Sequence, residues 1–116
     1  MRAEHLTREE QDCVDLLKGM GELYRRGGQS QRGLVMLLIA VHLAPNDPHL
    51  LRNLAMAFTD SDQPERALGA LEQLEQMQGV SPGLLLLRSR ALWRTGRTES
   101  ARDCFKGYLA ARRAAQ

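Results

Sequence analysis

The sequence predicts an all-α protein made of three similar helical pairs, and two observations support this fold class. First, residues of matching size recur at a fixed interval of 34 along the 116-residue chain. The interval links Leu17, Leu51 and Leu85, then Tyr24, Phe58 and Leu92, then Gly33, Ala67 and Ala101. Second, proline and glycine fall between segments that have the apolar spacing of amphipathic helices.

This pattern resembles the tetratricopeptide repeat (TPR), a helix–turn–helix unit of 34 residues. The matching units span about 14–47, 48–81 and 82–113, and residues 7–13 extend the first helix, so we expect residues 1–116 to form one domain. The pattern departs at Leu74, Arg88 and Tyr108, which replace small or apolar residues of the repeat. The resemblance implies a curved, right-handed solenoid.

Capping residues predict where the first helical pair begins and ends. Thr7 and Glu10 form a capping-box pattern, so the first helix should begin after Thr7. It should end near Arg26, because the glycines at 27–28 readily adopt the left-handed conformation that closes helices. The second helix should span about 30–43.

The later helices are marked by prolines at their first turns. Asp47 and Pro48 predict a helix over about 48–60, and Pro64 opens another that ends near 77. Ser81 repeats the combination of a cap followed by proline, and Gly96 ends the helix that it starts. Thr98 is expected to cap the last helix, which should end near 112.

Composition excludes several classes of function. No apolar run approaches 18 residues, so we expect no membrane insertion. The polar start MRAEHLTREE does not resemble a secretory signal, which indicates a cytoplasmic protein. Cys13 and Cys104 have no neighbouring ligand, and the histidines are scattered, so we expect no metal and no cofactor. No catalytic constellation is present, and an enzyme is not predicted.

Charge is distributed unevenly along the chain. Residues 82–116 carry eight basic and two acidic side chains, whereas the whole chain has a formal net charge of +2. This asymmetry suggests an interaction face. Nucleic acid is not the expected partner, because there is no lysine cluster and no aromatic residue interleaved with the basic ones.

The first helix of each pair should line the inner face of the array, and its residues there are the candidate partner-binding site. These groove residues are Lys18, Glu22, Arg25, Arg52, Met56, Leu86, Arg90, Trp93 and Arg94. Trp and Arg are the residue types most often found as interface anchors. Leu92 already occupies the core position beside Trp93, so we expect the indole to face a partner.

The last helix has no following helix to cover it. Phe105, Tyr108 and Leu109 should share one side of that helix. We expect a partner or a second copy to cover part of this surface; otherwise it stays half exposed to water.

The chain resembles the small TPR chaperones of bacterial type III secretion, most of all the YscY/PscY kind. The resemblance is strongest in the segment LLLLRSRALWRTGRTESARDCFKGYLAARR. It is carried by Leu87, the Ser-Arg-Ala at 89–91, Gly96, the Ala-Arg at 101–102, Phe105 and the Tyr-Leu at 108–109.

This resemblance implies a one-to-one complex with a small secreted protein of the YscX/PscX kind, and contact with the inner-membrane export gate. Alternatives from the same setting are a needle-subunit chaperone of the YscG kind and the longer translocator chaperones. A generic TPR adaptor, which assembles other proteins, is the alternative from a different class.

Overall fold

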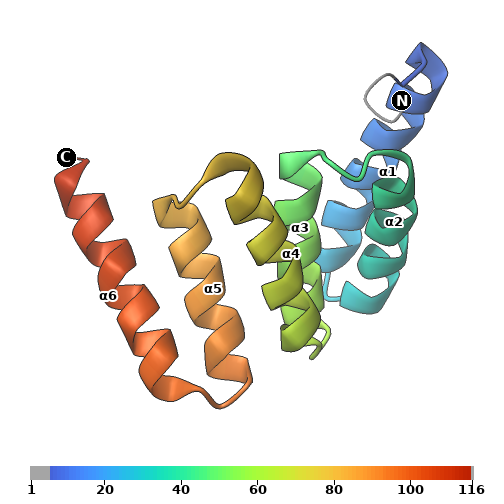
Figure 1. Cartoon of the computed structure of the whole chain (residues 1–116). Helices are drawn as coiled ribbons and strands as arrows, with labels where there is room; N and C mark the ends of the chain where they lie inside the picture. The colour runs from blue at the N-terminus through green and yellow to red at the C-terminus, as the bar shows by residue number, and fades with distance from the viewer. Residues whose placement is uncertain (1–5, 116) are drawn as a thin grey trace.

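The computed structural model describes residues 6–115, which form six helices and no strand. The helices are α1 (Arg8–Arg26), α2 (Ser30–Leu43), α3 (Pro48–Asp60), α4 (Pro64–Gln78), α5 (Pro82–Arg94) and α6 (Thr98–Ala114). Consecutive helices form three antiparallel pairs that follow one another from the α1–α2 end to the α6 end (Figure 1). The predicted all-α array of helical pairs is therefore confirmed.

The helices begin at the predicted caps, with one exception. Thr7 and Glu10 form both bonds of the capping box, at 3.0 and 3.1 Å. The side chains of Asp47 and Ser81 accept bonds from backbone amides of the helices that follow them. The expected Thr98 cap is wrong: Arg97 is the N-cap of α6, and its side chain makes no capping bond. The main chain closes this turn instead, since the Arg97 amide donates to the Leu92 carbonyl at 3.1 Å.

The turns inside the three pairs share one backbone feature. Gly28, Asp62 and Gly96 have φ values of +84°, +63° and +84°, and they are the residue series that the interval of 34 links. Each lies in the left-handed region, which reverses the chain at the end of the first helix of its pair. The repeat read from the sequence is thus also a repeat of backbone conformation.

Two glycines allow α1 and α2 to touch. A Cβ atom at Gly33 would lie 2.6 Å from the Gly21 carbonyl oxygen, and one at Gly21 would lie 2.7 Å from Leu37. Such distances are shorter than van der Waals contact, so only glycine fits this crossing. Other helical glycines, Gly19 and Gly69, have open space around them and do not mark close approach.

The core lies in the middle of the array. Its buried cluster is built from residues of α2, α3, α4 and α5, including Leu37, Leu50, Leu51, Leu71 and Leu84. The predicted contact positions Ala67 and Ala101 are both buried. Only Ala67 belongs to the cluster, so α6 is attached mainly through its contacts with α5.

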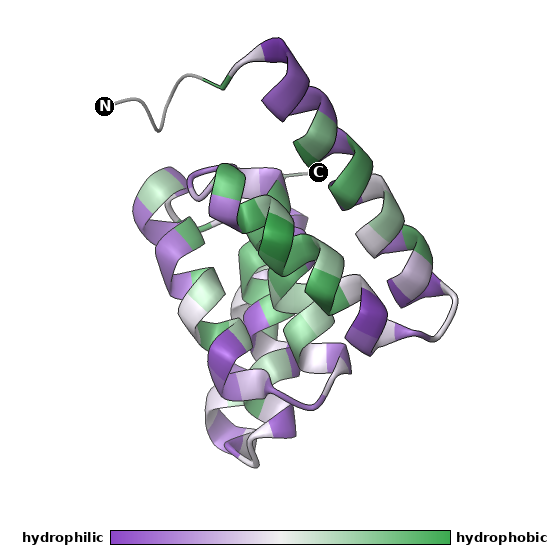
Figure 2. Cartoon of the chain, turned by 90° about the vertical axis from the view of Figure 1, so that its right-hand side faces the viewer, coloured by the Kyte–Doolittle hydropathy of each residue, from purple (hydrophilic) through white to green (hydrophobic). Residues whose placement is uncertain are grey.

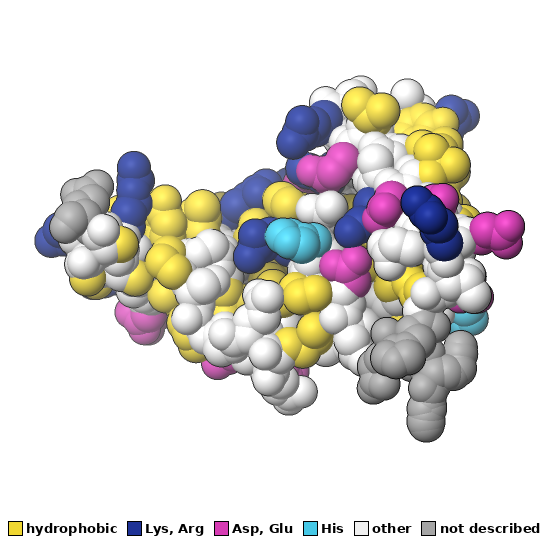
Figure 3. Space-filling model, turned by 90° about the horizontal axis from the view of Figure 1, so that it is seen from above, with side chains coloured by type: hydrophobic (Ala, Val, Ile, Leu, Met, Phe, Trp, Pro, Cys, Tyr) yellow, Lys and Arg dark blue, Asp and Glu magenta, His cyan; other side chains and the backbone are white. Residues whose placement is uncertain are grey.

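The array is bent, and the side that carries α1, α3 and α5 is hollowed (Figure 3). Lys and Arg side chains, with Asp and Glu between them, gather along this inner side. Within residues 6–115, no helix combines the length and the apolar character needed to cross a bilayer.

Candidate binding groove

The predicted groove residues come from the three helices on the hollowed side. Lys18, Glu22 and Arg25 lie on α1, and Arg52 and Met56 lie on α3. The remaining residues, Leu86, Arg90, Trp93 and Arg94, lie on α5. The structure divides this set into side chains that bind one another and side chains that stay free.

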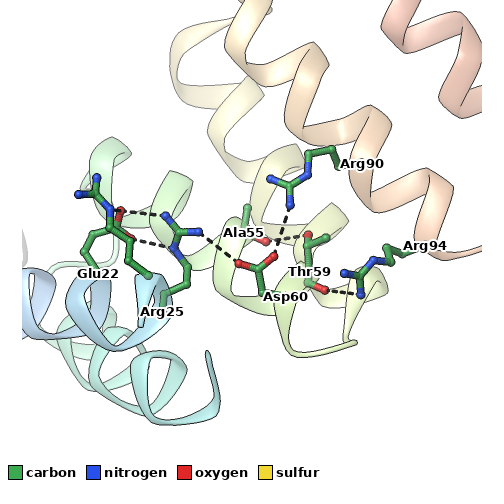
Figure 4. Close-up of polar contacts among 8 residues, drawn as sticks. Glu22, Arg25, Ala55, Thr59, Asp60, Arg90 and Arg94 are labelled. Carbon is green, nitrogen blue, oxygen red and sulfur yellow. Dashed lines mark hydrogen bonds and ion pairs between the residues drawn. The ribbon is translucent and has the colours of Figure 1, made fainter. Parts of the chain in front are cut away.

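A ladder of ion pairs crosses the groove floor from α1 to α5 (Figure 4). Arg25 donates two bonds to Glu22, at 2.9 and 3.1 Å, and a third to Asp60 on α3 at 3.2 Å. Arg90 of α5 approaches the other Asp60 oxygen at 3.4 Å. Asp60 therefore joins two arginines from different helical pairs. The ladder fixes the spacing of α1, α3 and α5.

Arg94 makes the next rung along the groove. Its guanidinium donates to the Thr59 carbonyl of α3 at 3.1 Å (Figure 4). The Thr59 hydroxyl turns inward and donates to the Ala55 carbonyl of its own helix at 2.9 Å. The rung thus uses a main-chain acceptor at the end of α3, where helix carbonyls lack partners within the helix.

The ion pairs shift the acidities of their members. Bonding from Arg25 lowers the pKa of Glu22, although partial burial of the carboxyl opposes this. The bond to Glu22 raises the pKa of Arg25 further, and Asp60 adds to this effect. Partial burial alone would raise the pKa of Asp47, but bonds from Lys18, at 3.0 Å, and from two backbone amides outweigh it, so that this pKa is lowered. All these groups are charged at neutral pH.

Several predicted residues are not consumed by internal bonds. In the described part of the chain, the buried Nε atom of Arg52 has no hydrogen-bond partner. Met56 and Leu86 are half-buried and face the groove from neighbouring pairs. Trp93 is the most open, because 63% of its surface is exposed. It lies next to the buried Leu92, as the sequence predicted.

A hollow of about 440 Å³ lies where α3, α5 and α6 meet. Its lining contains four of the predicted residues, Leu86, Arg90, Trp93 and Arg94, together with Thr59, Ser89 and Phe105. Sequence reasoning assigned Phe105 to the uncovered side of the last helix and not to the groove. The signal that could have placed it here is the missing seventh helix, which in an extended array would cover this ring.

The chemistry of this hollow suits recognition. Trp93 and Phe105 offer apolar rings, and Arg90 and Arg94 place two cations beside them. Among residues 6–115, no group of three or more potential ligands is arranged to hold a metal ion. No family model matches the chain, and no match was found among the curated proteins.

Proposed function

We propose that the chain is a TPR protein that binds an amphipathic helix of a partner in its concave groove. The observation that carries the proposal is the exposed Trp93 ring, held between Arg90 and Arg94 at the open end of the hollow. An exposed tryptophan flanked by arginines has the composition of an interface hot spot. A right-handed solenoid, as in other TPR arrays, would wrap this groove around a helix.

The ladder of ion pairs supports binding by a preformed surface. Arg25, Asp60 and Arg90 fix the three inner helices before a partner arrives. Less ordering free energy is then lost on binding than by a flexible surface. The free side chains are basic or apolar, so the partner helix should carry an apolar face with an acidic edge.

The resemblance to type III secretion chaperones gives this activity a biological setting. On this proposal the protein is a cytoplasmic chaperone that holds a small secreted partner of the YscX/PscX kind until export. A secreted subunit with an exposed apolar helix would associate with itself, and burying that helix in the groove prevents this. Complex formation would also stabilise both chains by mass action. Contact with the export gate would follow delivery.

The single tryptophan of the chain makes the proposal directly testable. We would titrate the protein with a synthetic amphipathic helix whose apolar face is bordered by glutamates, and follow the emission of Trp93. Binding should move the emission to shorter wavelength, because the ring leaves water. A matched peptide with lysines in place of the glutamates is the control. Equal binding of both peptides, or no shift with either, would contradict the proposed groove chemistry.

The secretion setting needs a separate experiment. We would coexpress the chain with the small proteins encoded beside its gene and measure the mass of any complex. A one-to-one complex with a secreted neighbour supports the chaperone. Binding of the acidic-edged peptide without any such complex would support the generic adaptor instead.

A further inference from the structure

The two ends of the array expose apolar residues at positions that are buried elsewhere in the chain. On α1, Leu16 and Leu23 are 63% and 73% exposed. One interval of 34 residues later the same positions hold Leu50 and Ala57, and one interval further Leu84 and Ala91, all of which are buried. In α3 and α5 these positions pack against the preceding pair, and α1 has no such neighbour in the described chain. Figure 2 looks onto this open end.

The opposite end has the complementary half of the same contact. Phe105 and Tyr108 of α6 correspond to Leu71 and Leu74 of α4, which are buried where the next pair begins. Both α6 rings remain partly exposed, with their centroids 5.7 Å apart. The outer face of α6 and the outer face of α1 are therefore the two sides of a joint that the chain already makes twice, between α2 and α3 and between α4 and α5.

We propose that a second copy of this chain stacks head to tail on the first, with its α1 packed against α6. The bonds of the groove floor show that the register continues. The pair Arg25–Asp60 recurs one interval later as the pair Thr59–Arg94. A further interval brings Arg26 of the second copy opposite Trp93. A guanidinium and an indole form a favourable cation–π pair.

A second rung gives the same result with opposite charges. Asp60 binds Arg90 at 3.4 Å between α3 and α5. One interval later, Arg94 stands in the place of Asp60, and Glu22 of the second copy stands in the place of Arg90. The signs of the charges are exchanged and remain complementary.

The centre of the joint is complementary as well. In the joint between α4 and α5, Glu75 is paired with Arg88. The corresponding residues of the first joint are Val41 and Leu54, both part of the apolar core. In the proposed joint they are Leu109 and Met20 of the second copy, again an apolar pair. A hollow of about 320 Å³ lies beside Met20, between Leu23 and Tyr24.

The ends of the two helices also carry opposite charges. The last turn of α6 contains Arg112 and Arg113, and both are exposed. The first turns of α1 contain Glu9 and Asp12, which are exposed on the same side as Leu16. An antiparallel joint places the end of α6 near the start of the neighbouring α1. Attraction there favours the head-to-tail contact over a contact between two like ends.

Such a contact joins different surfaces, so it leaves one free end of each kind. The association should therefore produce dimers, trimers and longer rows with rising concentration, and no closed dimer. A symmetric dimer through either end would stop at two copies. Sedimentation velocity over the widest attainable concentration range distinguishes the two patterns.

The decisive test exchanges the central pair for the ion pair that α4 and α5 already use. Leu109→Glu and Met20→Arg should each weaken self-association by about tenfold or more, because each buries one charge without a partner. The double variant should recover association to within a few-fold of the parent, since the carboxylate introduced at position 109 of one copy then meets the guanidinium introduced at position 20 of the next. The two positions lie at opposite ends of one chain, so a contact within the chain cannot produce the recovery.

Val35→Glu is the matched control. Val35 is 52% exposed on α2, and its counterpart Gly69 stays exposed in the array, so this change should leave association unaltered. Helix content of every variant is measured to confirm folding. A parent that stays monomeric at all concentrations would overturn the proposal. So would single variants that associate like the parent, a double variant without recovery, or loss of association in Val35→Glu. None of the substituted residues belongs to the groove, so partner binding can be scored independently.

Discussion

At the scale of single residues, Leu92 and Trp93 show how one helix serves both the fold and the groove. The two are neighbours in α5, yet Leu92 is 8% exposed and Trp93 is 63% exposed. Consecutive helical residues point about 100° apart, so one can face the core while the next faces the groove. The sequence predicted this division, because Leu92 falls in the apolar series of the repeat and Trp93 does not.

Replacing Trp93 by alanine should therefore weaken binding without unfolding the protein. We expect a loss of about 2 kcal/mol or more in binding of the acidic-edged peptide, measured by calorimetry, with an unchanged melting temperature. Leu92→Ala is the contrasting variant. It should leave a cavity in the core and cost about 2–5 kcal/mol of stability. A sharp fall in the melting temperature of Trp93→Ala would mean that the indole supports the fold.

Glu22 should make stability dependent on pH through its pairing with Arg25. Its pKa is lowered from an ordinary value of 4.5, so its contribution is complete above that value and is lost as the pH falls through the folded-state pKa. Glu22→Gln should reduce the free energy of unfolding at about pH 7, and the difference from the parent should shrink by about pH 3. Urea unfolding at both pH values measures this. A difference independent of pH would show that the carboxylate charge does not stabilise the fold.

At the scale of elements, the turn within each pair depends on one left-handed residue. Glycine occupies this position at 28 and 96, whereas the middle pair has Asp62 with φ of +63°. Residues with a Cβ atom are strained there, and aspartate tolerates the conformation better than most. The middle turn therefore holds a strain that the outer turns lack.

Asp62→Gly should relieve that strain. We expect a stabilisation of about 0.5–1 kcal/mol, after allowing for the greater freedom of glycine in the unfolded chain. Gly28→Ala is the reverse change at the corresponding turn and should destabilise by a similar or larger amount. Chemical denaturation midpoints of the two variants give both signs. A destabilised Asp62→Gly would indicate that the aspartate side chain holds the turn.

The helix crossing in the first pair can be tested against an open position. Gly33→Ala should cost about 1–3 kcal/mol, because the added methyl group meets the Gly21 carbonyl at 2.6 Å. Gly69→Ala makes the same change within α4, where nothing lies within 4 Å of the new atom. It should stabilise the helix by about 0.5–1 kcal/mol. Thermal melts of both variants would show whether space, and not helix propensity, decides the outcome.

Local signals account for the parts of the fold that the sequence predicted. Caps such as Thr7 and Asp47 act within three residues, so helix starts can be read from the sequence alone. The groove floor could not be read in this way, because Asp60 binds arginines 35 and 30 residues distant in sequence. The recurrence of Arg25–Asp60 as Thr59–Arg94 becomes visible only when the pairs are stacked. Phe105 was misplaced for the same reason, since its surroundings depend on how α6 lies against α5.

At the scale of the whole molecule, burial decreases from the middle of the array toward its ends. The main buried cluster draws on α2 to α5, and α1 contributes only the partly buried Leu17 at its edge. Repeat arrays approximate a row of units, each stabilised by its neighbours, so units at the ends are the least stable. Hydrogen exchange should accordingly be slowest in α3 and α4 and fastest in α6.

Overpacking the same repeat position in two pairs measures this gradient. Ala67 and Ala101 hold equivalent positions, and Ala67 lies inside the main cluster whereas Ala101 lies outside it. Ala67→Leu should cost about 3 kcal/mol, near the upper end for an overpacked core, because α3 and α5 confine α4 on both sides. Ala101→Leu should cost about 1 kcal/mol, since α6 has an open side and can move outward. Urea unfolding of both variants, with binding of the acidic-edged peptide as a check on the groove, completes the test. Equal costs at the two sites would mean that the stability of the array is uniform from its centre to its last helix.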